Sequence, residues 1–242
     1  MSGNKGILRR RIGILGGAFN PVHIGHLRIA LECSQLLAAD HFLLMPTAVP
    51  PHKSSRNLLP FALRCELLEA AIKDLPPLRV SRIEGERREA SFTWDTLGLL
   101  QQEHMAAQLF FVVGCEDFSK LPSWRHGLDL PFRAHLCVVP RGHMAEDVFL
   151  ASAGNFWPEA RASAPVAETG KTLEIPGPKG ISGHITYLDI PFLPVSATGL
   201  REGWLQGKNI RFLLPDAAFA LLEERRPEID AIWGSNEVLR GT

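Results

Sequence analysis

The sequence predicts an α/β fold in which a doubly wound parallel sheet carries helices on both faces. Short apolar runs typical of buried strands recur along the chain, and segments with the apolar spacing of amphipathic helices separate them. Strands that alternate with helices favour parallel pairing. Because crossovers between parallel strands are right-handed, we expect the helices to cover both faces of the sheet.

Composition limits the classes of function open to this chain. Its 242 residues have ordinary globular composition and a formal net charge of zero, which fits one α/β domain without a general affinity for nucleic acid or membranes. No apolar run approaches the length of a membrane span, and the basic segment 1–11 lacks an apolar signal core. We therefore expect a cytoplasmic protein with neither nucleic-acid nor membrane partners, and nothing in the sequence predicts an oligomeric state.

The four cysteines are scattered through the chain. Cys33, Cys65, Cys115 and Cys137 form no CxxC pair, so neither a zinc site nor a disulfide framework is indicated. We expect reduced, largely buried thiols and no metal site built from protein ligands.

The expected elements follow in chain order. Strands are predicted at residues 12–15, 41–45, 78–83, 109–113, 135–139 and 184–190. Helices are predicted from residue 25 onward and at residues 60–74, 93–104, 196–206 and 215–225, with Thr93 as an N-cap and Pro215 at a suitable first position.

Two segments lack a clear pattern. Residues 143–184 are rich in Ala, Gly, Pro and Ser with poor periodicity, and we expect a surface loop insertion there, with a substrate lid as the alternative. Residues 226–242 carry no functional signal and are expected to form a C-terminal tail. The folded domain is therefore expected to span residues 10–225.

The segment 12–27 carries the strongest functional signal. Gly16 and Gly17 follow a buried strand and allow a sharp turn and the close approach of a ligand. His23 and His26, three residues apart, share a face at the start of the next helix. A lone histidine there would more often be a core residue, but free N–H groups and the helix dipole already favour an anion. The two imidazoles therefore indicate a phosphate site, beyond the carboxyl end of a strand where such sheets bind ligands.

A second phosphate site is predicted at residues 195–201. Thr198 is a natural N-cap, which would place Arg201 in the first helical turn. A cation there is unfavourable by about 0.3–1 kcal/mol unless an anion lies between it and the helix N–H groups. The alternative is a surface arginine paired with a neighbouring carboxylate such as Glu202.

Residues 16–27, GGAFNPVHIGHL, resemble the GGTFDPxHxGHL motif of the nucleotidylyltransferase superfamily. Later stretches narrow the resemblance to the bacterial nicotinate-nucleotide adenylyltransferases, and it covers most of residues 10–140 and 185–224. It implies a Rossmann-like sheet and a single nucleotidylyltransferase domain over residues 10–225.

The resemblance also implies which residues act on ATP. Residues 195–201 are similar to the family motif ISSTxIR, which holds the ATP phosphates, and Arg201 is implied as catalytic together with His23 and His26. Three positions depart from the family, since Ala18 replaces Thr, Asn20 replaces Asp and Ala197 replaces the second Ser. The implied ATP-binding residues are Gly16, Gly17, Ala18, Phe19, His23, Gly25, His26, Gly114, Glu116, Asp117, Ser196, Thr198 and Arg201.

Four further stretches imply the site of the second substrate. They are residues 50–53 (PPHK), 91–97 (SFTWDTL, similar to SYTFDT), 114–124 (similar to GxDxxxxLPxW) and the turn 140–142. The substrate-binding residues implied by them are Lys53, Thr93, Thr96, Trp124 and Arg141, with Trp124 stacking on the nicotinate ring. The family's ribose-binding Asp aligns with Glu116, and Asp117 comes one place later, so either carboxylate is a candidate.

The implied reaction joins ATP to nicotinate mononucleotide and releases nicotinate adenine dinucleotide and pyrophosphate, with Mg²⁺ accompanying ATP. The attacking phosphate has a second pKa of about 6, so no enzyme nucleophile is needed. The requirement is instead to position two anions and to stabilise the leaving pyrophosphate. Nicotinamide mononucleotide or another phosphate is the alternative acceptor, and a non-catalytic nucleotide-binding module is the alternative from another class. A class I aminoacyl-tRNA synthetase shares the HxGH pattern, but this chain is short and has no KMSKS-like loop.

Overall fold

The computed structural model describes residues 9–49, 57–87, 89–140, 146–168 and 170–234, and these residues form one eight-stranded sheet. The strand order is β3-β2-β1-β4-β5-β8-β7-β6. The strands are β1 (Arg11–Gly17), β2 (His41–Pro46), β3 (Leu78–Val80), β4 (Gln108–Gly114), β5 (His135–Val139), β6 (Arg161–Ser163), β7 (Lys171–Pro176) and β8 (Ser182–Tyr187). Strands β1 to β5 and β8 pair in parallel, whereas β7 and β6 extend the sheet in antiparallel fashion.

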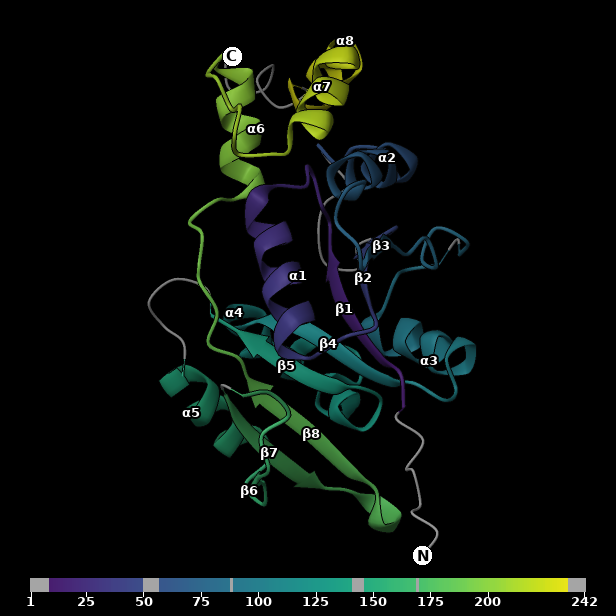
Figure 1. Ribbon diagram of the computed structural model, residues 1–242, viewed down its shortest axis with the longest axis vertical. Coiled ribbons are helices and arrows are strands. Elements are labelled where there is room, and N and C mark those ends of the chain that lie inside the picture. Colours follow the sequence, from purple (N-terminus) through teal and green to yellow (C-terminus); the bar gives the residue numbers. More distant parts are fainter. Residues whose placement is uncertain (1–8, 50–56, 88, 141–145, 169, 235–242) are drawn as a thin grey trace, which may run out of the picture.

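The helices lie on both faces of the sheet, as the sequence predicts (Figure 1). The α-helices are α1 (Ile24–Leu36), α2 (Phe61–Ile72), α3 (Thr93–Glu103), α4 (Cys115–Phe118), α5 (Glu146–Phe156), α6 (Ala197–Leu205), α7 (Asp216–Glu224) and α8 (Arg226–Trp233). Short 3₁₀ segments are η1 (Leu121–Ser123), η2 (Gly127–Phe132) and η3 (Pro178–Gly180).

Strand β4 shows how the sequence pattern builds two cores. Phe110 and Val112 pack with α1, α2 and the C-terminal helices, whereas Leu109, Phe111 and Val113 pack with α3, α4 and α5. Successive side chains of a strand point to opposite faces, and a strand covered on both faces reads as a continuous apolar run. The doubly wound α/β prediction is confirmed.

The crossovers bring the carboxyl ends of β1, β4 and β5 to one edge of the sheet. Strand β1 lies between β2 and β4, and the connections that leave β1 and β4 lead directly into α1 and α4. At such a reversal of strand order the two connections leave on opposite sides and open a crevice. The predicted site residues lie along this edge.

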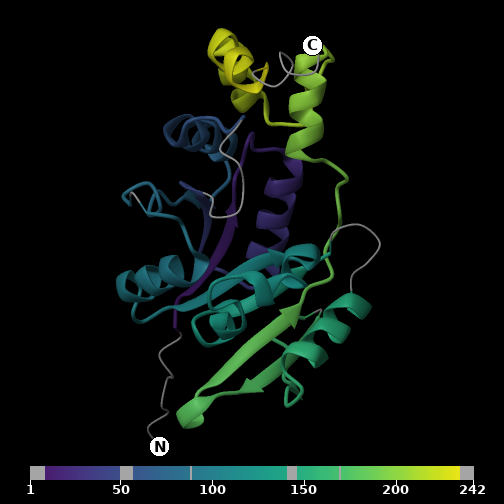
Figure 2. The same ribbon diagram turned by 180° about the vertical axis from the view of Figure 1, so that it is seen from behind.

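The prediction of a surface loop at residues 143–184 is wrong for the part of that segment the structure describes. Helix α5 is followed by β6 and β7, and β7 pairs with β8 over its whole length (Figure 2). Thr172 and Ile175 of β7 are buried, which gives the strand the contacts that fix it. Frequent small residues and prolines hid this pattern, because the segment is stabilised by pairing with β8 more than by its own periodicity.

The predicted C-terminal tail is also partly wrong. Residues 226–233 form α8, and Ile229 and Trp233 are fully buried beside α6 and α7. Pro227 in the first turn and the spacing of Ile229, Ile232 and Trp233 are the helix signals in this stretch. Helices α6, α7 and α8 gather at one end of the molecule, beyond α1 and α2 (Figures 1 and 2).

The four cysteines are free and buried, as expected. Burial raises the pKa of Cys33 to about 12, so this thiol stays protonated and unreactive. Among the described residues, no helix is both long and apolar enough to cross a bilayer.

Candidate active site

A cleft of about 460 Å³ opens at the carboxyl edge of the sheet, between the N-termini of α1 and α6. It takes residues from segments that lie far apart in the sequence. The residues that line it are Leu15, Gly16, Gly17, Ala18, Phe19, Asn20, His23, Gly25, His26, Ile29, Leu58, Phe111, Val112, Val113, Gly114, Asp117, Trp124, Val139, Pro140, Pro191, Phe192, Leu193, Val195, Ser196, Ala197, Thr198 and Arg201. Both predicted phosphate motifs therefore face one shared cleft.

The β1–α1 connection places its backbone turn differently from the prediction. Gly16 and Gly17 belong to the extended strand, and the residue with a left-handed conformation is Phe19, at a φ of 46°. The side chain of Phe19 is buried in the core, which holds this backbone conformation in place. The two glycines instead leave the end of β1 without side chains, so that a ligand can approach the backbone of the cleft wall.

The two histidines stack on each other at the start of α1. Their ring centroids are 3.7 Å apart, and the ring of Phe19 meets His26 edge-on at 4.8 Å. The backbone N–H of His23 donates to Nδ1 of His26 at 3.3 Å. This bond requires a lone pair on Nδ1, so the neutral imidazole of His26 carries its proton on Nε2. A side chain at Gly25 would meet the ring of His23 at 3.0 Å, so glycine leaves room for the stacked pair.

The N-cap of helix α6 lies two residues earlier in the chain than predicted. Its N-cap is Ser196, whose Oγ accepts a hydrogen bond from the Gly199 N–H at 3.1 Å, whereas Thr198 lies inside the first turn. Arg201 therefore lies in the second turn and reaches back along the helix. It donates to the backbone oxygen of Asn20 at 2.7 Å and to the hydroxyl of Thr198 at 3.2 Å.

The position of Arg201 favours the phosphate-site interpretation over the surface ion pair. In the described part of the chain, the hydrogen bonds of its guanidinium go to Asn20 and Thr198, and Glu202 acts on it only as a nearby charge. Burial lowers the pKa of this guanidinium from its ordinary value, yet arginine remains charged at neutral pH. The cleft therefore has a fixed, half-buried cation on the α6 side.

The side chain of Asn20 explains the departure from the family's Asp. It is buried, its Oδ1 accepts from the Leu59 N–H at 3.1 Å, and its Nδ2 donates to the Asn57 carbonyl at 2.6 Å. A carboxylate would supply no donor for that carbonyl oxygen. In this chain the residue holds the segment before α2 against the β1–α1 turn.

Sequence reasoning missed Arg64, the most deeply buried cation among the described residues that surround the cleft. Its side chain is 1% exposed and donates to the carbonyl oxygens of Leu59 at 2.9 Å and Ala18 at 2.8 Å. The available signal was an arginine on the apolar face of α2, between Leu63 and Leu67. Arg64 fixes the backbone of the glycine-rich connection from behind.

The β4 side of the cleft contributes Gly114, Asp117 and Trp124. Glu116, the other candidate for a ribose contact, is exposed like Asp117 but is not among the lining residues. The structure thus favours Asp117 over Glu116 at this position. The indole of Trp124 comes from the chain between η1 and η2.

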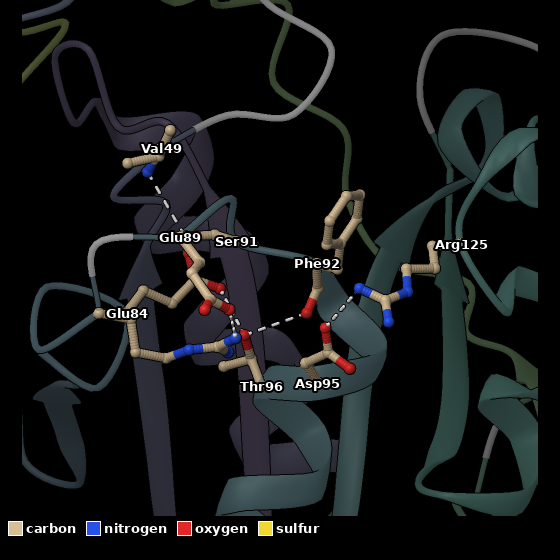
Figure 3. A network of polar contacts seen from close by, with 9 residues as sticks. Val49, Glu84, Glu89, Ser91, Phe92, Asp95, Thr96 and Arg125 are labelled. Atoms are coloured by element: carbon tan, nitrogen blue, oxygen red, sulfur yellow. Dashed lines mark hydrogen bonds and ion pairs between the residues drawn. The ribbon is translucent and has the colours of Figure 1, made fainter.

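Thr93 and Thr96 lie at the start of α3 and do not line this cleft. Phe92, rather than Thr93, is the N-cap. The side chain of Thr96 is fully buried, and its hydroxyl lies within donating distance of Oε1 of Glu84 at 3.0 Å and of the Phe92 carbonyl oxygen at 3.2 Å (Figure 3). The Thr96 hydroxyl is therefore engaged inside the protein with Glu84, and the structure does not support the expectation that it binds substrate. The predicted contacts Lys53 and Arg141 lie outside the described residues.

Comparison with known proteins places this geometry in a family. Residues 14–189 match the model of the cytidylyltransferase-like family. The relative named "Probable nicotinate-nucleotide adenylyltransferase" from Citrifermentans bemidjiense is 36% identical over 225 residues, which cover 91% of this chain and 99% of the relative. The protein of the same name from Pseudomonas fluorescens is 36% identical over 216 residues, covering 88% and 95% of the two chains.

Solved structures with low sequence identity share the fold. The Plasmodium falciparum nicotinic acid mononucleotide adenylyltransferase complexed with NaAD has a TM-score of 0.67 at 17% identity, over 90% of this chain and 96% of that chain. The same enzyme complexed with APC gives a TM-score of 0.65 at 16% identity, with the same coverage. The sequence match over nine-tenths of the chain and the shared fold lead to one conclusion: this chain belongs to the cytidylyltransferase-like family and, within it, to the nicotinate-nucleotide adenylyltransferases.

Proposed function

We propose that this protein transfers the adenylyl group of ATP to nicotinate mononucleotide, forming nicotinate adenine dinucleotide and pyrophosphate. The observation that carries the proposal is the convergence of the α1 and α6 N-termini on one cleft, joined by the hydrogen bond from Arg201 to Asn20. Helix N-termini present unpaired N–H groups and a partial positive charge to an anion. The names of the relatives supply the acceptor, a nicotinate nucleotide, and the adenylyl group that is transferred.

The proposed mechanism needs no enzyme nucleophile. The 5′-phosphate of the mononucleotide attacks the α-phosphorus of ATP, the bond from that phosphorus to the β-phosphate oxygen breaks, and pyrophosphate leaves with the electron pair. With a second pKa of about 6, the attacking phosphate is mostly a dianion at neutral pH. The protein must then bring two anions together and stabilise the growing negative charge.

His26 and Arg201 are the residues we assign to that charge. The Nδ1 atom of His26 accepts from the backbone, so its Nε2–H is the group able to donate to a phosphate oxygen. The guanidinium of Arg201 has five N–H donors, and two of them donate to Asn20 and Thr198. The remaining donors give a fixed cation for the β- and γ-phosphates.

The other assigned ATP contacts surround these two. His23 stacks on His26 and restricts the tilt of its ring. Ser196 accepts a hydrogen bond as the helix cap and still has an O–H to donate, while Ala197 has no hydroxyl to offer. Gly16 and Gly17 leave the β1 edge open to the triphosphate.

For the acceptor we propose the β4 side of the cleft. Trp124 offers an indole face on which a pyridine ring can stack. Thr93, at the N-terminal end of α3, is proposed to place helix N–H groups near the acceptor's carboxylate. Lys53 and Arg141 stay proposed contacts on the strength of their motifs.

We propose Mg²⁺ as a companion of ATP, one that neutralises phosphate charge. Magnesium that accompanies a nucleotide keeps several waters and phosphate oxygens and takes one or two protein carboxylates. Asp117 is the carboxylate that lines the cleft, and the described residues contain no cluster of three or more metal-ligating side chains. The donor set therefore fits an ion held mainly by the substrate.

We also propose a cytoplasmic location. The four cysteines are free and buried, which is typical of a reducing compartment.

A panel of acceptors tests the proposed function. The purified protein is mixed with ATP and Mg²⁺, and pyrophosphate release is followed with nicotinate mononucleotide, nicotinamide mononucleotide and phosphopantetheine in parallel. Release fastest with nicotinate mononucleotide is the expected result. Faster release with another acceptor would assign a different substrate, and ATP binding without turnover for any acceptor would identify a non-catalytic nucleotide-binding module.

A further inference from the structure

A buried carboxylate lies behind the start of α3, outside the cleft. Glu84 is in the turn that follows β3 and is 3% exposed. Its Oε2 accepts from the backbone N–H of Ala48 at 3.2 Å and its Oε1 from the hydroxyl of Thr96 at 3.0 Å, and the Ser91 side chain is a third hydrogen-bond partner. Figure 3 shows Glu84, Ser91 and Thr96 pointing toward one another. A buried carboxylate that accepts several hydrogen bonds holds together the segments that supply the donors.

The donors come from two segments that reach the active-site edge of the sheet. Ala48 follows β2, and its neighbour Thr47 donates its backbone N–H to the carbonyl of Gly17 at 2.9 Å, at the end of β1. Ser91 and Thr96 flank the N-cap of α3. Glu84 therefore joins the start of α3 to a loop that is itself bonded to the phosphate-binding glycine pair.

Direct bonds between the two segments run beside the carboxylate. The N–H of Ser91 donates to the carbonyl of Val49 at 3.0 Å, and the N–H of Val49 approaches Oγ of Ser91 at 3.4 Å (Figure 3). The loop after β2 and the start of α3 contact each other through this pair, and the buried Glu84 side chain is hydrogen-bonded to both segments. Removing the carboxylate would leave the Val49–Ser91 pair to hold the α3 start alone.

The carboxyl of Glu84 also interacts electrostatically with nearby charged groups. Burial raises the pKa of this carboxyl, whereas the hydrogen bonds and Arg87 lower it. Burial lowers the pKa of Arg64, which holds the glycine-rich connection through Ala18, and the nearby charge of Glu84 offsets part of that lowering. Glu84 thus contributes electrostatically to the guanidinium that holds the glycine-rich connection. An amide in place of the carboxylate would turn an NH₂ group toward one of the donors and would remove the charge.

We propose that Glu84 is a positioning residue for the acceptor nucleotide, because it fixes the start of α3 against the loop after β2 and so sets the acceptor's distance from the ATP phosphates. The inference rests on the proposed function, in which the α3 start binds the mononucleotide. Loss of this alignment weakens acceptor binding and in-line attack, while the ATP phosphates keep their contacts on α1 and α6. A misplacement of about 1 Å costs on the order of 100-fold in rate.

The test compares Glu84→Gln with the wild-type protein and with Glu69→Gln. Glu69 is an exposed carboxylate that accepts from Arg82, so its variant controls for loss of a hydrogen-bonded charge in the same region. We expect Glu84→Gln to raise the KM for nicotinate mononucleotide about tenfold and to lower kcat, with the KM for ATP changed less than about twofold. Glu69→Gln is expected to leave both KM values near those of the wild type.

Thr96 gives a second, milder test in case Glu84→Gln does not fold. Thr96→Val removes one donor to Glu84 without changing charge, and Thr96→Ser keeps the hydroxyl. We expect the acceptor KM to rise from the wild type to Thr96→Ser and to be highest in Thr96→Val.

Two results would overturn the inference. One is an acceptor KM that does not respond to Glu84→Gln or Thr96→Val. The other is an equal rise in both KM values together with a lower melting temperature, which would show a purely structural carboxylate. Failure of the proposed function is separate, since the wild-type protein itself would then release no pyrophosphate with nicotinate mononucleotide.

Discussion

The guanidinium of Arg201 donates a 2.7 Å hydrogen bond to the backbone carbonyl of Asn20, a residue 181 positions earlier in the chain. This bond joins the start of α6 to the turn between β1 and α1. It also fixes the distance between the cation of one phosphate motif and the imidazoles of the other. A ligand that carries several phosphates can therefore meet both motifs without first ordering them, which lowers the entropic cost of binding.

Replacing Arg201 should impair turnover and leave the fold intact. We expect Arg201→Ala to lower kcat by about 10²–10³-fold, the usual effect of removing one preorganised donor to developing charge. The kcat of Arg201→Lys should fall between those of the wild type and Arg201→Ala, because an ammonium cannot bond Asn20 and also present a planar fork to phosphate. Steady-state kinetics with circular dichroism measure both effects, and Arg161→Ala, an exposed arginine of β6, is the control. Wild-type kcat in Arg201→Lys would contradict this role.

His26 should contribute separately to stability and to turnover. His26→Ala removes the acceptor for the His23 N–H at the start of α1, a loss worth about 0.5–2 kcal/mol at a helix cap. Glutamine is a natural residue at this capping-box position, so His26→Gln should keep the cap and lose the imidazole. We expect kcat to fall at least about 100-fold in both variants.

Urea unfolding and pyrophosphate release separate the two contributions of His26. We expect the free energy of unfolding to fall clearly only in His26→Ala. Near-full activity of folded His26→Gln would remove the imidazole from the proposed mechanism.

Restoring the family's acid at position 20 should destabilise this chain. In the wild-type protein, Nδ2 of Asn20 donates a hydrogen bond of 2.6 Å to the Asn57 carbonyl. In Asn20→Asp, a carboxylate oxygen would face this carbonyl instead. Loss of a donor to a part-buried carbonyl costs about 1–3 kcal/mol. The free energy of unfolding at pH 7 should fall by that amount in urea titrations. An unchanged unfolding midpoint would show that the loop before α2 adapts to the acid.

A buried histidine at the opposite end of the sheet should make stability depend on pH. His135 is hydrogen-bonded through Nε2 to the hydroxyl of Thr186 at 2.6 Å, and Thr186 in turn bonds Thr172 at 2.8 Å. Burial lowers the pKa of His135 to about 3, with further lowering by the charges of His184 and Arg11. Between that value and the unfolded pKa near 6.5, the unfolded chain binds the extra proton, so stability falls as pH falls.

Comparison of wild type with His135→Gln tests this dependence. The amide keeps a polar partner for Thr186 and does not titrate. From pH 7 to pH 5, the wild-type protein should lose on the order of 2 kcal/mol more unfolding free energy than the variant, because each pH unit below 6.5 contributes up to about 1.4 kcal/mol. Parallel losses in the two proteins would show that His135 is protonated in the folded state.

Much of the fold and part of the site could be predicted from local patterns. The run at 109–113 and the spacing of His23 and His26 are short-range signals, and they predicted the strand β4 and two imidazoles on one face at the start of α1; the stacking of the rings was not predicted. The prediction for α6 was less accurate, since the choice between Ser196 and Thr198 as N-cap depends on which hydroxyl reaches a free N–H.

The sequence by itself predicted the parallel α/β sheet and the two motifs that face one cleft at its carboxyl edge, because each follows from periodicity or from residues close together in the chain. Only the tertiary structure decided that Arg64 and Glu84 are buried, that α8 packs into the core and that β7 joins the sheet. The physical reason is that burial of a charge or of a short strand depends on partners supplied by distant segments, such as Ala18 for Arg64 and Ala48 for Glu84. Such partners meet only when the chain folds.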